Sequence, residues 1–173
     1  FRENILSKYM EAIVCVNMND GIGLKGRIPW KSFVYEDFIR TEIVGCGNNA
    51  IIMGHKTFKS LGYIPLPGVR NYILSRNINI YIKAKADVIV ESNPDNLWFL
   101  MSIFENVYVL GGESTYSFFE PYIKTVHYFT VDRLGICDRH FPIDLSDFEE
   151  KNFQFFKERY NHLTYIEYEK KSL

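Results

Sequence analysis

Two adjacent carboxylates, Glu36 and Asp37, interrupt an apolar segment that follows a Pro-Trp loop. The stretch SFVYEDFIRTEIV, residues 32–44, is typical of a helix that begins at Ser32. A carboxylate on the apolar side of such a helix is costly to bury unless it is paired, so its presence there suggests a binding role. Because neighbouring helical residues point about 100° apart, only one of the two acids can face a given ligand. Both are therefore candidates for a binding or catalytic carboxylate.

Three glycine-containing turns follow apolar stretches: GIGLKG at 21–26, GHKT at 54–57 and GGEST at 111–115. Glycine lets a ligand approach the backbone closely, and the free N–H groups at the start of a helix favour phosphate. The second and third turns each open a predicted helix, although neither has the spacing of a GxGxxG or P-loop motif. Each turn taken alone is also compatible with an ordinary chain reversal.

The elements that must position these residues alternate along the chain. Short apolar runs typical of buried strands occur at 11–17, 49–54, 71–76, 86–92, 106–112 and 125–133. Helical segments are predicted at 32–44, 55–62, 94–104 and 114–122, and a hairpin near Asn161 within 153–171. This order predicts a single α/β domain with a central, mainly parallel sheet of about eight strands, an antiparallel C-terminal edge and about four flanking helices. Ligand-binding loops are then expected at the carboxyl ends of the strands.

Composition limits the remaining function classes. The chain has 173 residues, of which 47% are hydrophobic, and its net charge is −1. This length suits one well-filled core, and the charge gives no general attraction to nucleic acid or to an anionic membrane. Three widely spaced cysteines show no metal-type spacing and no disulfide framework, so we expect no metal and a reducing, cytoplasmic compartment. The first residues, FRENILSKYM, lack the apolar run of a signal peptide.

Several segments together resemble the dihydrofolate reductase family. They occur in the family's order, from about residue 10 to the end: GIGLKGRIPW, IIMGHKTFKSLG, PLPG, NYILSR, VYVLGGESTY, FTVD and DRHFP. The resemblance implies a dihydrofolate reductase-like domain at 10–173, preceded by an N-terminal extension at 1–9. It also implies hydride transfer from NADPH to dihydrofolate, a function in thymidylate and one-carbon metabolism, and binding of antifolates.

The resemblance also assigns catalytic residues. Family members carry a pterin-binding carboxylate five or six residues after the loop tryptophan, which here is Trp30. The sequence EDF is similar to the family's acid-Asp-Leu, which favours Asp37 as this carboxylate, with Glu36 as the alternative. Trp30 matches the tryptophan that holds a water near the acid, and Thr130 matches a threonine that buttresses the acid through a hydrogen bond.

By the same resemblance, the substrate contacts are Ile13, Val14, Cys15, Phe38, Leu61, Arg70, Leu110 and Tyr116. The cofactor contacts are Ile22, Gly54, His55, Lys56, Thr57, Leu74, Ser75, Arg76, Gly111, Gly112, Glu113, Ser114 and Thr115. Ile28 belongs to the loop that closes over the nicotinamide. The bond between the two glycines of the third turn is usually cis in the family.

The sequence also departs from the family pattern. Val69 stands where members carry an arginine for the glutamate α-carboxylate of folate, and Arg70 replaces it only if a bulge follows Gly68. Arg139 stands where a threonine is usual. Two alternative functions follow: a reductase of another pteridine or pyrimidine on the same fold, and a non-catalytic nucleotide-binding protein. The candidate pterin-side acid speaks against the first, although Val69 leaves it open. The second conflicts with the presence of both a candidate acid and the cofactor turns.

Overall fold

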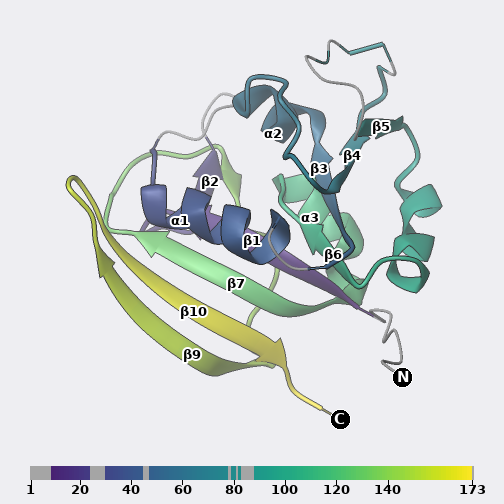
Figure 1. Cartoon of the computed structure of the whole chain (residues 1–173). Coiled ribbons are helices and arrows are strands. Elements are labelled where there is room, and N and C mark those ends of the chain that lie inside the picture. Colours follow the sequence, from purple (N-terminus) through teal and green to yellow (C-terminus); the bar gives the residue numbers. More distant parts are fainter. Residues whose placement is uncertain are drawn as a thin grey trace.

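The computed structural model describes residues 9–23, 30–44, 47–77, 79–80, 82 and 88–172. Its centre is an eight-stranded sheet with the order β5-β4-β3-β6-β1-β7-β10-β9, and a small second sheet pairs β2 with β8. The strands from β5 to β7 are parallel to one another, whereas β10 runs antiparallel to both β7 and β9. Figure 1 shows the β9–β10 hairpin in yellow at one edge of this sheet.

Six strands lie close to the predicted apolar runs: β1 Met10–Val16, β3 Asn49–Gly54, β4 Arg70–Leu74, β5 Val88–Glu91, β6 Asn106–Val109 and β7 Ile123–Val131. The predicted C-terminal hairpin is formed by β9 Phe148–Lys157 and β10 His162–Lys170, whereas the short strands β2 Gly21–Gly23 and β8 Arg139–His140 were not predicted. The helices are α1 Phe33–Phe38, α2 His55–Ser60, α3 Glu113–Phe119, the π-helix η1 Ile39–Val44, and the 3₁₀ helices η2 Pro94–Ser102 and η3 Glu120–Tyr122. The fold class predicted from the sequence is therefore confirmed.

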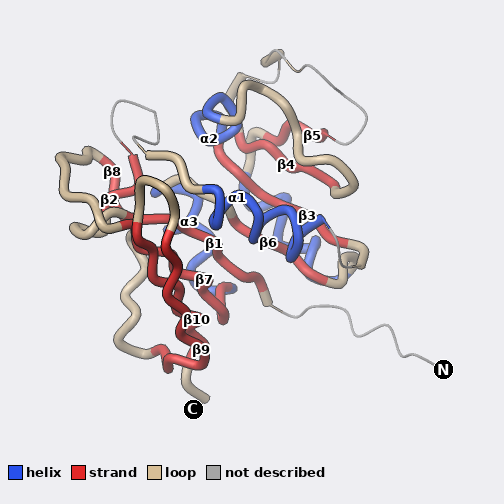
Figure 2. The backbone as a smooth tube through the Cα atoms, turned by 60° about the vertical axis from the view of Figure 1, so that its left-hand side comes forward, coloured by secondary structure: helices blue, strands red, loops and turns tan. Residues whose placement is uncertain are grey.

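Both faces of the parallel sheet are covered, which explains why its strands are apolar on both sides. Alternate residues of β1 and β3, such as Val14 and Ile52, pack with Leu100 of η2 and Phe119 of α3. The intervening residues, such as Ile13 and Ile51, face η1 and α2 and form a second apolar cluster. Figure 2 shows α1 lying along the sheet. The result is a three-layer arrangement in which the strand ends are left free for loops.

The first turn of α1 is fixed by a contact between distant parts of the chain. The Ser32 side chain caps the helix by accepting a hydrogen bond from the backbone N–H of Tyr35 at 3.1 Å. Ser32 Oγ and the backbone N–H of Val34 both donate to the Glu158 carboxylate, at 2.8 and 2.7 Å. Glu158 lies in the turn between β9 and β10, so the C-terminal hairpin sets the rotation of α1 about its own axis.

Among the described residues, the helices are too short or too polar to cross a membrane. Residues 1–8 lie outside the described part of the chain, so the N-terminal extension predicted at 1–9 stays an expectation.

Candidate active site

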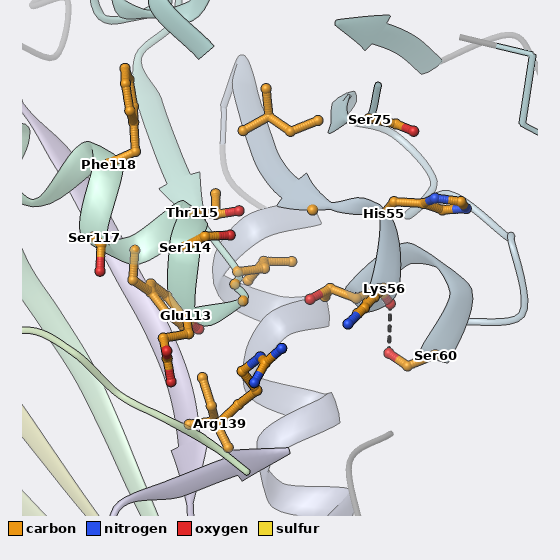
Figure 3. A pocket seen from close by; sticks show the side chains of 18 of the residues that line it. His55, Lys56, Ser60, Ser75, Glu113, Ser114, Thr115, Ser117, Phe118 and Arg139 are labelled. Atoms are coloured by element: carbon orange, nitrogen blue, oxygen red, sulfur yellow. Dashed lines mark hydrogen bonds between the residues drawn. The ribbon is translucent and has the colours of Figure 1, made fainter. Parts of the chain in front are cut away.

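A cavity of about 1110 Å³ lies where the parallel strands end. Its lining comes from the ends of β1, β3 and β4, from the loop after β6, and from the starts of α2 and α3. Figure 3 shows His55 and Lys56 of α2 and Ser114 and Thr115 of α3 around the same hollow. This is the edge of an open parallel sheet at which ligands bind in α/β proteins.

Two helix starts meet in this cavity. Gly54 precedes α2 and Gly112 precedes α3, and neither helix has a side-chain cap that occupies its first N–H groups. The Gly54 N–H donates to the Gly111 carbonyl oxygen at 2.7 Å, which ties the two turns together. The Gly111–Gly112 peptide bond is cis, as the sequence resemblance implied. Paired free helix starts of this kind suit a ligand with two phosphate groups.

The described lining of the cavity carries more positive than negative charge. Lys56, Arg76 and Arg139 are its cationic side chains, and Glu113 is its one carboxylate among the described residues. Glu113 accepts a hydrogen bond from the His140 backbone N–H at 2.6 Å. Arg76 lies just beyond the end of β4, so positive charge extends along the cavity from α2 to that strand. Phosphate groups are favoured by such donors.

The inner end of the cavity is mostly apolar and closely packed. It is lined by Val14 and Cys15 of β1, Leu110, Tyr116 of α3 and Tyr35 of α1. The Tyr116 hydroxyl donates to the Ile13 carbonyl oxygen at 2.6 Å, which fixes the ring against β1. A flat, uncharged ring fits a surface of this kind, because aromatic and aliphatic side chains exclude water from both of its faces.

Cys15 is held as a neutral thiol. Burial raises its pKa to about 12, and the hydrogen bond that Trp30 Nε1 donates to Sγ at 3.3 Å only partly opposes this rise. Because a thiolate forms only above the pKa, Cys15 stays protonated at neutral pH.

We expect Cys15 to react with maleimide at least about a hundredfold more slowly than an unperturbed thiol, because the thiolate is the reacting form. Peptide mapping of the alkylated protein after timed exposure at pH 8 would measure this rate. Cys137, which is half-buried, is the internal comparison. Labelling of Cys15 as fast as that of Cys137, or a Cys15 labelling rate that levels off by pH 9, would contradict a raised pKa.

Comparisons with known proteins agree with this geometry. The sequence model of the dihydrofolate reductase family matches residues 9–170. The chain belongs to this family. It is 30% identical to the dihydrofolate reductase of Aedes albopictus, covering 82% of this chain and 83% of that protein. It is 29% identical to the Staphylococcus haemolyticus enzyme, covering 80% of each chain.

Other relatives are longer, and the fold has a solved counterpart. The chain is 31% identical to the bifunctional dihydrofolate reductase-thymidylate synthase of Paramecium tetraurelia, where the match covers 62% of this chain and 22% of the relative. The chain therefore spans only a part of the length of that relative. Dihydrofolate reductase from Enterococcus faecalis, solved with NADP(H) and RAB-propyl, superimposes with a TM-score of 0.83 at 20% identity, covering 96% of this chain and 99% of the other.

Neither candidate acid of α1 lines the main cavity among its described residues. Asp37 lines a second cavity of about 450 Å³, together with Phe38 and His127, and Glu36 lines neither. Both acids are exposed. Tyr35, which the sequence argument passed over, takes the side of α1 that faces the main cavity. Asp37 is two residues further on and points about 200° away, which explains the separation. Asp37→Asn remains the direct test of the catalytic role predicted for Asp37.

Strand β4 begins at Arg70 and pairs with β3 without a register shift, so the bulge that would bring Arg70 to the ligand does not occur within β4. Residues of β3 and β4 pair one to one from Ala50–Arg70 to Gly54–Leu74. Val69 is 4% exposed and packs in the apolar cluster with Ile43, whereas Arg70 is exposed and does not line the cavity. The cavity therefore has no guanidinium from this turn.

Most of the other predicted site residues line the cavity, and five do not. Every residue predicted to contact the cofactor lines the cavity, as do Val14, Cys15, Leu110 and Tyr116 of the predicted substrate contacts. Five others do not line it: Ile13, Trp30, Phe38, Leu61 and Thr130. Thr130 pairs with Val16 and Thr164 within the sheet, and Leu61 is exposed at the end of α2. Ile28 lies outside the described residues.

Sequence reasoning missed eight residues of the lining: Tyr35, Ser60, Asn77, Ser92, Pro94, Ser117, Phe118 and Arg139. Most are small or polar residues beside predicted contacts, and their types carry little signal. Tyr35 is different, because it lies five residues after Trp30, which is the shorter of the two spacings that the family uses for its carboxylate. Attention to spacing without regard to residue type would have found it. Among the described residues, no cluster of metal-ligating side chains occurs.

Proposed function

We propose that this chain reduces 7,8-dihydrofolate to tetrahydrofolate with NADPH as the hydride donor, and so supports thymidylate and one-carbon metabolism. The observation that supports this most directly is the single cavity that gathers every predicted cofactor contact beside an apolar slot for flat rings. The catalytic demand is mainly one of orientation, because fixing two rings face to face can lower a barrier by several kcal/mol. When bound, NADPH supplies the hydride, and a proton completes the reduction.

The residues of the chain divide this task between binding and shielding. The starts of α2 and α3 bind the pyrophosphate through their free N–H groups, with Lys56 and Arg76 supplying positive charge. The inner residues Val14, Leu110 and Tyr116 then hold the reacting rings and exclude water. Because the rings are held by shape, the inner end of the cavity needs few polar contacts.

The direct experiment follows the loss of reduced-nicotinamide absorbance when dihydrofolate is added to protein and NADPH. A tail-less dihydropterin in a parallel assay tests the alternative of a reductase for another pteridine. Turnover of dihydrofolate supports the proposal. Turnover of the tail-less ring alone, or binding of NADPH with no turnover of either compound, would overturn it.

We expect a preference for NADPH over NADH, because Arg76 and Lys56 place positive charge where the 2′-phosphate lies by family resemblance. A charge-assisted hydrogen bond is worth roughly 1.5–3 kcal/mol, so Arg76→Ala should raise the Michaelis constant for NADPH by about tenfold or more and leave that for NADH nearly unchanged. Lys59→Ala is the matched control, because Lys59 is exposed on α2 and does not line the cavity. Equal use of both cofactors by the unmodified protein would contradict this assignment.

We also propose a cytoplasmic location and small-molecule partners, namely dihydrofolate and antifolates, with no need for nucleic acid or membrane. The free thiols of Cys15 and Cys137 and the net charge of −1 support this proposal. Fractionation of cells that express a tagged form of the protein would test the location.

A further inference from the structure

Tyr35 is the residue of α1 that reaches the inner end of the cavity. Its backbone N–H donates to the Ser32 cap, and its ring packs edge-on against Phe129, with 5.4 Å between centroids and 76° between planes. The cap is itself held by Glu158 from the C-terminal hairpin. The backbone of Tyr35 is thus held by the helix cap, and its ring is held by Phe129.

The Tyr35 hydroxyl has no hydrogen-bond partner among the described residues. Every fully enclosed side-chain N or O atom of the described residues does have a partner. Two other tyrosines have partners within the protein: Tyr116, which also lines the cavity, donates to the Ile13 carbonyl oxygen, and Tyr165 pairs with His127. Tyr35 is half-buried, so its unpaired hydroxyl is not enclosed by protein. Because Tyr35 lines the cavity, a ligand bound there can supply the hydrogen-bond partner.

The hydroxyl is also held in its neutral form. Burial raises the pKa of Tyr35, and the nearby thiol of Cys15 raises it further if that group is ionised. The inner end of the cavity thus presents a phenol O–H and a thiol S–H, and the carboxylates of Glu36 and Asp37 lie outside it. The one carboxylate of the described lining, Glu113, lies at the start of α3 and accepts a hydrogen bond from the His140 backbone N–H.

We propose, on the basis of the proposed function, that Tyr35 is the specificity-determining residue that contacts the hydrogen-bonding edge of the substrate ring. Its phenol donates one neutral hydrogen bond to a ring nitrogen or carbonyl oxygen. A carboxylate at the same place would accept from two N–H groups and would attract a protonated ring. The site therefore selects neutral rings that offer an acceptor, and it binds cationic diaminopyrimidines weakly.

The experiment compares Tyr35→Asp and Tyr35→Phe with the unmodified protein. The probe is 2,4-diamino-5-benzylpyrimidine, whose ring takes up a proton when it pairs with a carboxylate, and its dissociation constant is measured by calorimetry. Tyr35→Asp should bind this probe about 10- to 100-fold more tightly, the usual gain from a charge-assisted pair. Tyr35→Phe should raise the Michaelis constant for dihydrofolate by about tenfold, because one hydrogen bond is lost. Tyr160→Phe is the matched control, since Tyr160 is exposed and does not line the cavity.

An NADPH titration of each variant reports folding and cofactor binding independently of the ring site, and dissociation constants within twofold of the unmodified protein are expected. If Tyr35→Asp no longer binds NADPH, the dihydrofolate kinetics of Tyr35→Phe alone test the proposal. Unchanged dihydrofolate kinetics in Tyr35→Phe, or loss of reduction in Asp37→Asn alone, would overturn the proposal. Because probe binding needs no turnover, a protein that binds NADPH but does not reduce dihydrofolate refutes the proposed function and still tests Tyr35.

Discussion

Replacement of Gly111 by alanine is expected to weaken NADPH binding by at least about tenfold, because a strained backbone of this kind costs roughly 1–3 kcal/mol. Gly111 has a φ of +121°, a backbone angle that residues other than glycine rarely adopt. An added Cβ would also lie 3.4 Å from both Thr57 Oγ1 and the Tyr116 ring. The turn would have to shift, and with it the Gly111 carbonyl that accepts from Gly54 and aligns the two helix starts.

Gly62→Ala is the control variant, because it adds backbone strain at a position away from the cavity. Gly62 also has a positive φ, +70°, but a Cβ there would meet nothing within 4 Å, and the residue does not line the cavity. Both variants should lose thermal stability, by about 2–4 °C for each kcal/mol. Only Gly111→Ala should lose NADPH affinity, as measured by fluorescence titration. Equal NADPH affinity in Gly111→Ala and the unmodified protein would refute the role assigned to this turn.

Val69→Arg is expected to tighten the binding of dihydrofolate by about 10- to 150-fold, because by family resemblance an arginine at this position reaches the glutamate carboxylate and adds roughly 1.5–3 kcal/mol. The affinity for a tail-less dihydropterin should not change, since that compound has no carboxylate. Val69 is 4% exposed, so the larger side chain should also lower the melting temperature through overpacking. Isothermal titration with both compounds measures the difference.

Two variants control the Val69 experiment. Val69→Met adds comparable length without charge, so it should reproduce the loss of stability and none of the gain in affinity. Arg70→Ala should leave dihydrofolate binding within about twofold, because Arg70 is exposed and does not line the cavity. A large loss of affinity in Arg70→Ala would show that Arg70 reaches the ligand in spite of the regular pairing of β3 and β4.

The sequence by itself determined the sheet, the order of its elements and the two glycine turns that open α2 and α3. Strands such as β1 and β3 are apolar on both faces, and this pattern is a local property of the chain. The turns at Gly54 and Gly111 are equally local, because residue type limits the backbone angles and the helix start supplies the N–H groups. For this reason, every cofactor contact named from the sequence lines one cavity.

Only the tertiary structure decided which side of α1 faces the main cavity. Residues 35, 36 and 37 all suit a helix, and their sequence does not say which of them points inward. The choice depends on the rotation of α1, which is fixed by the bond from Ser32 to Glu158, 126 residues further along the chain. That contact turns Tyr35 toward the cavity and Asp37 toward the second one. Likewise, Val69 is buried against Ile43 of η1 just before β4 pairs with β3, and these are long-range contacts that local sequence does not encode.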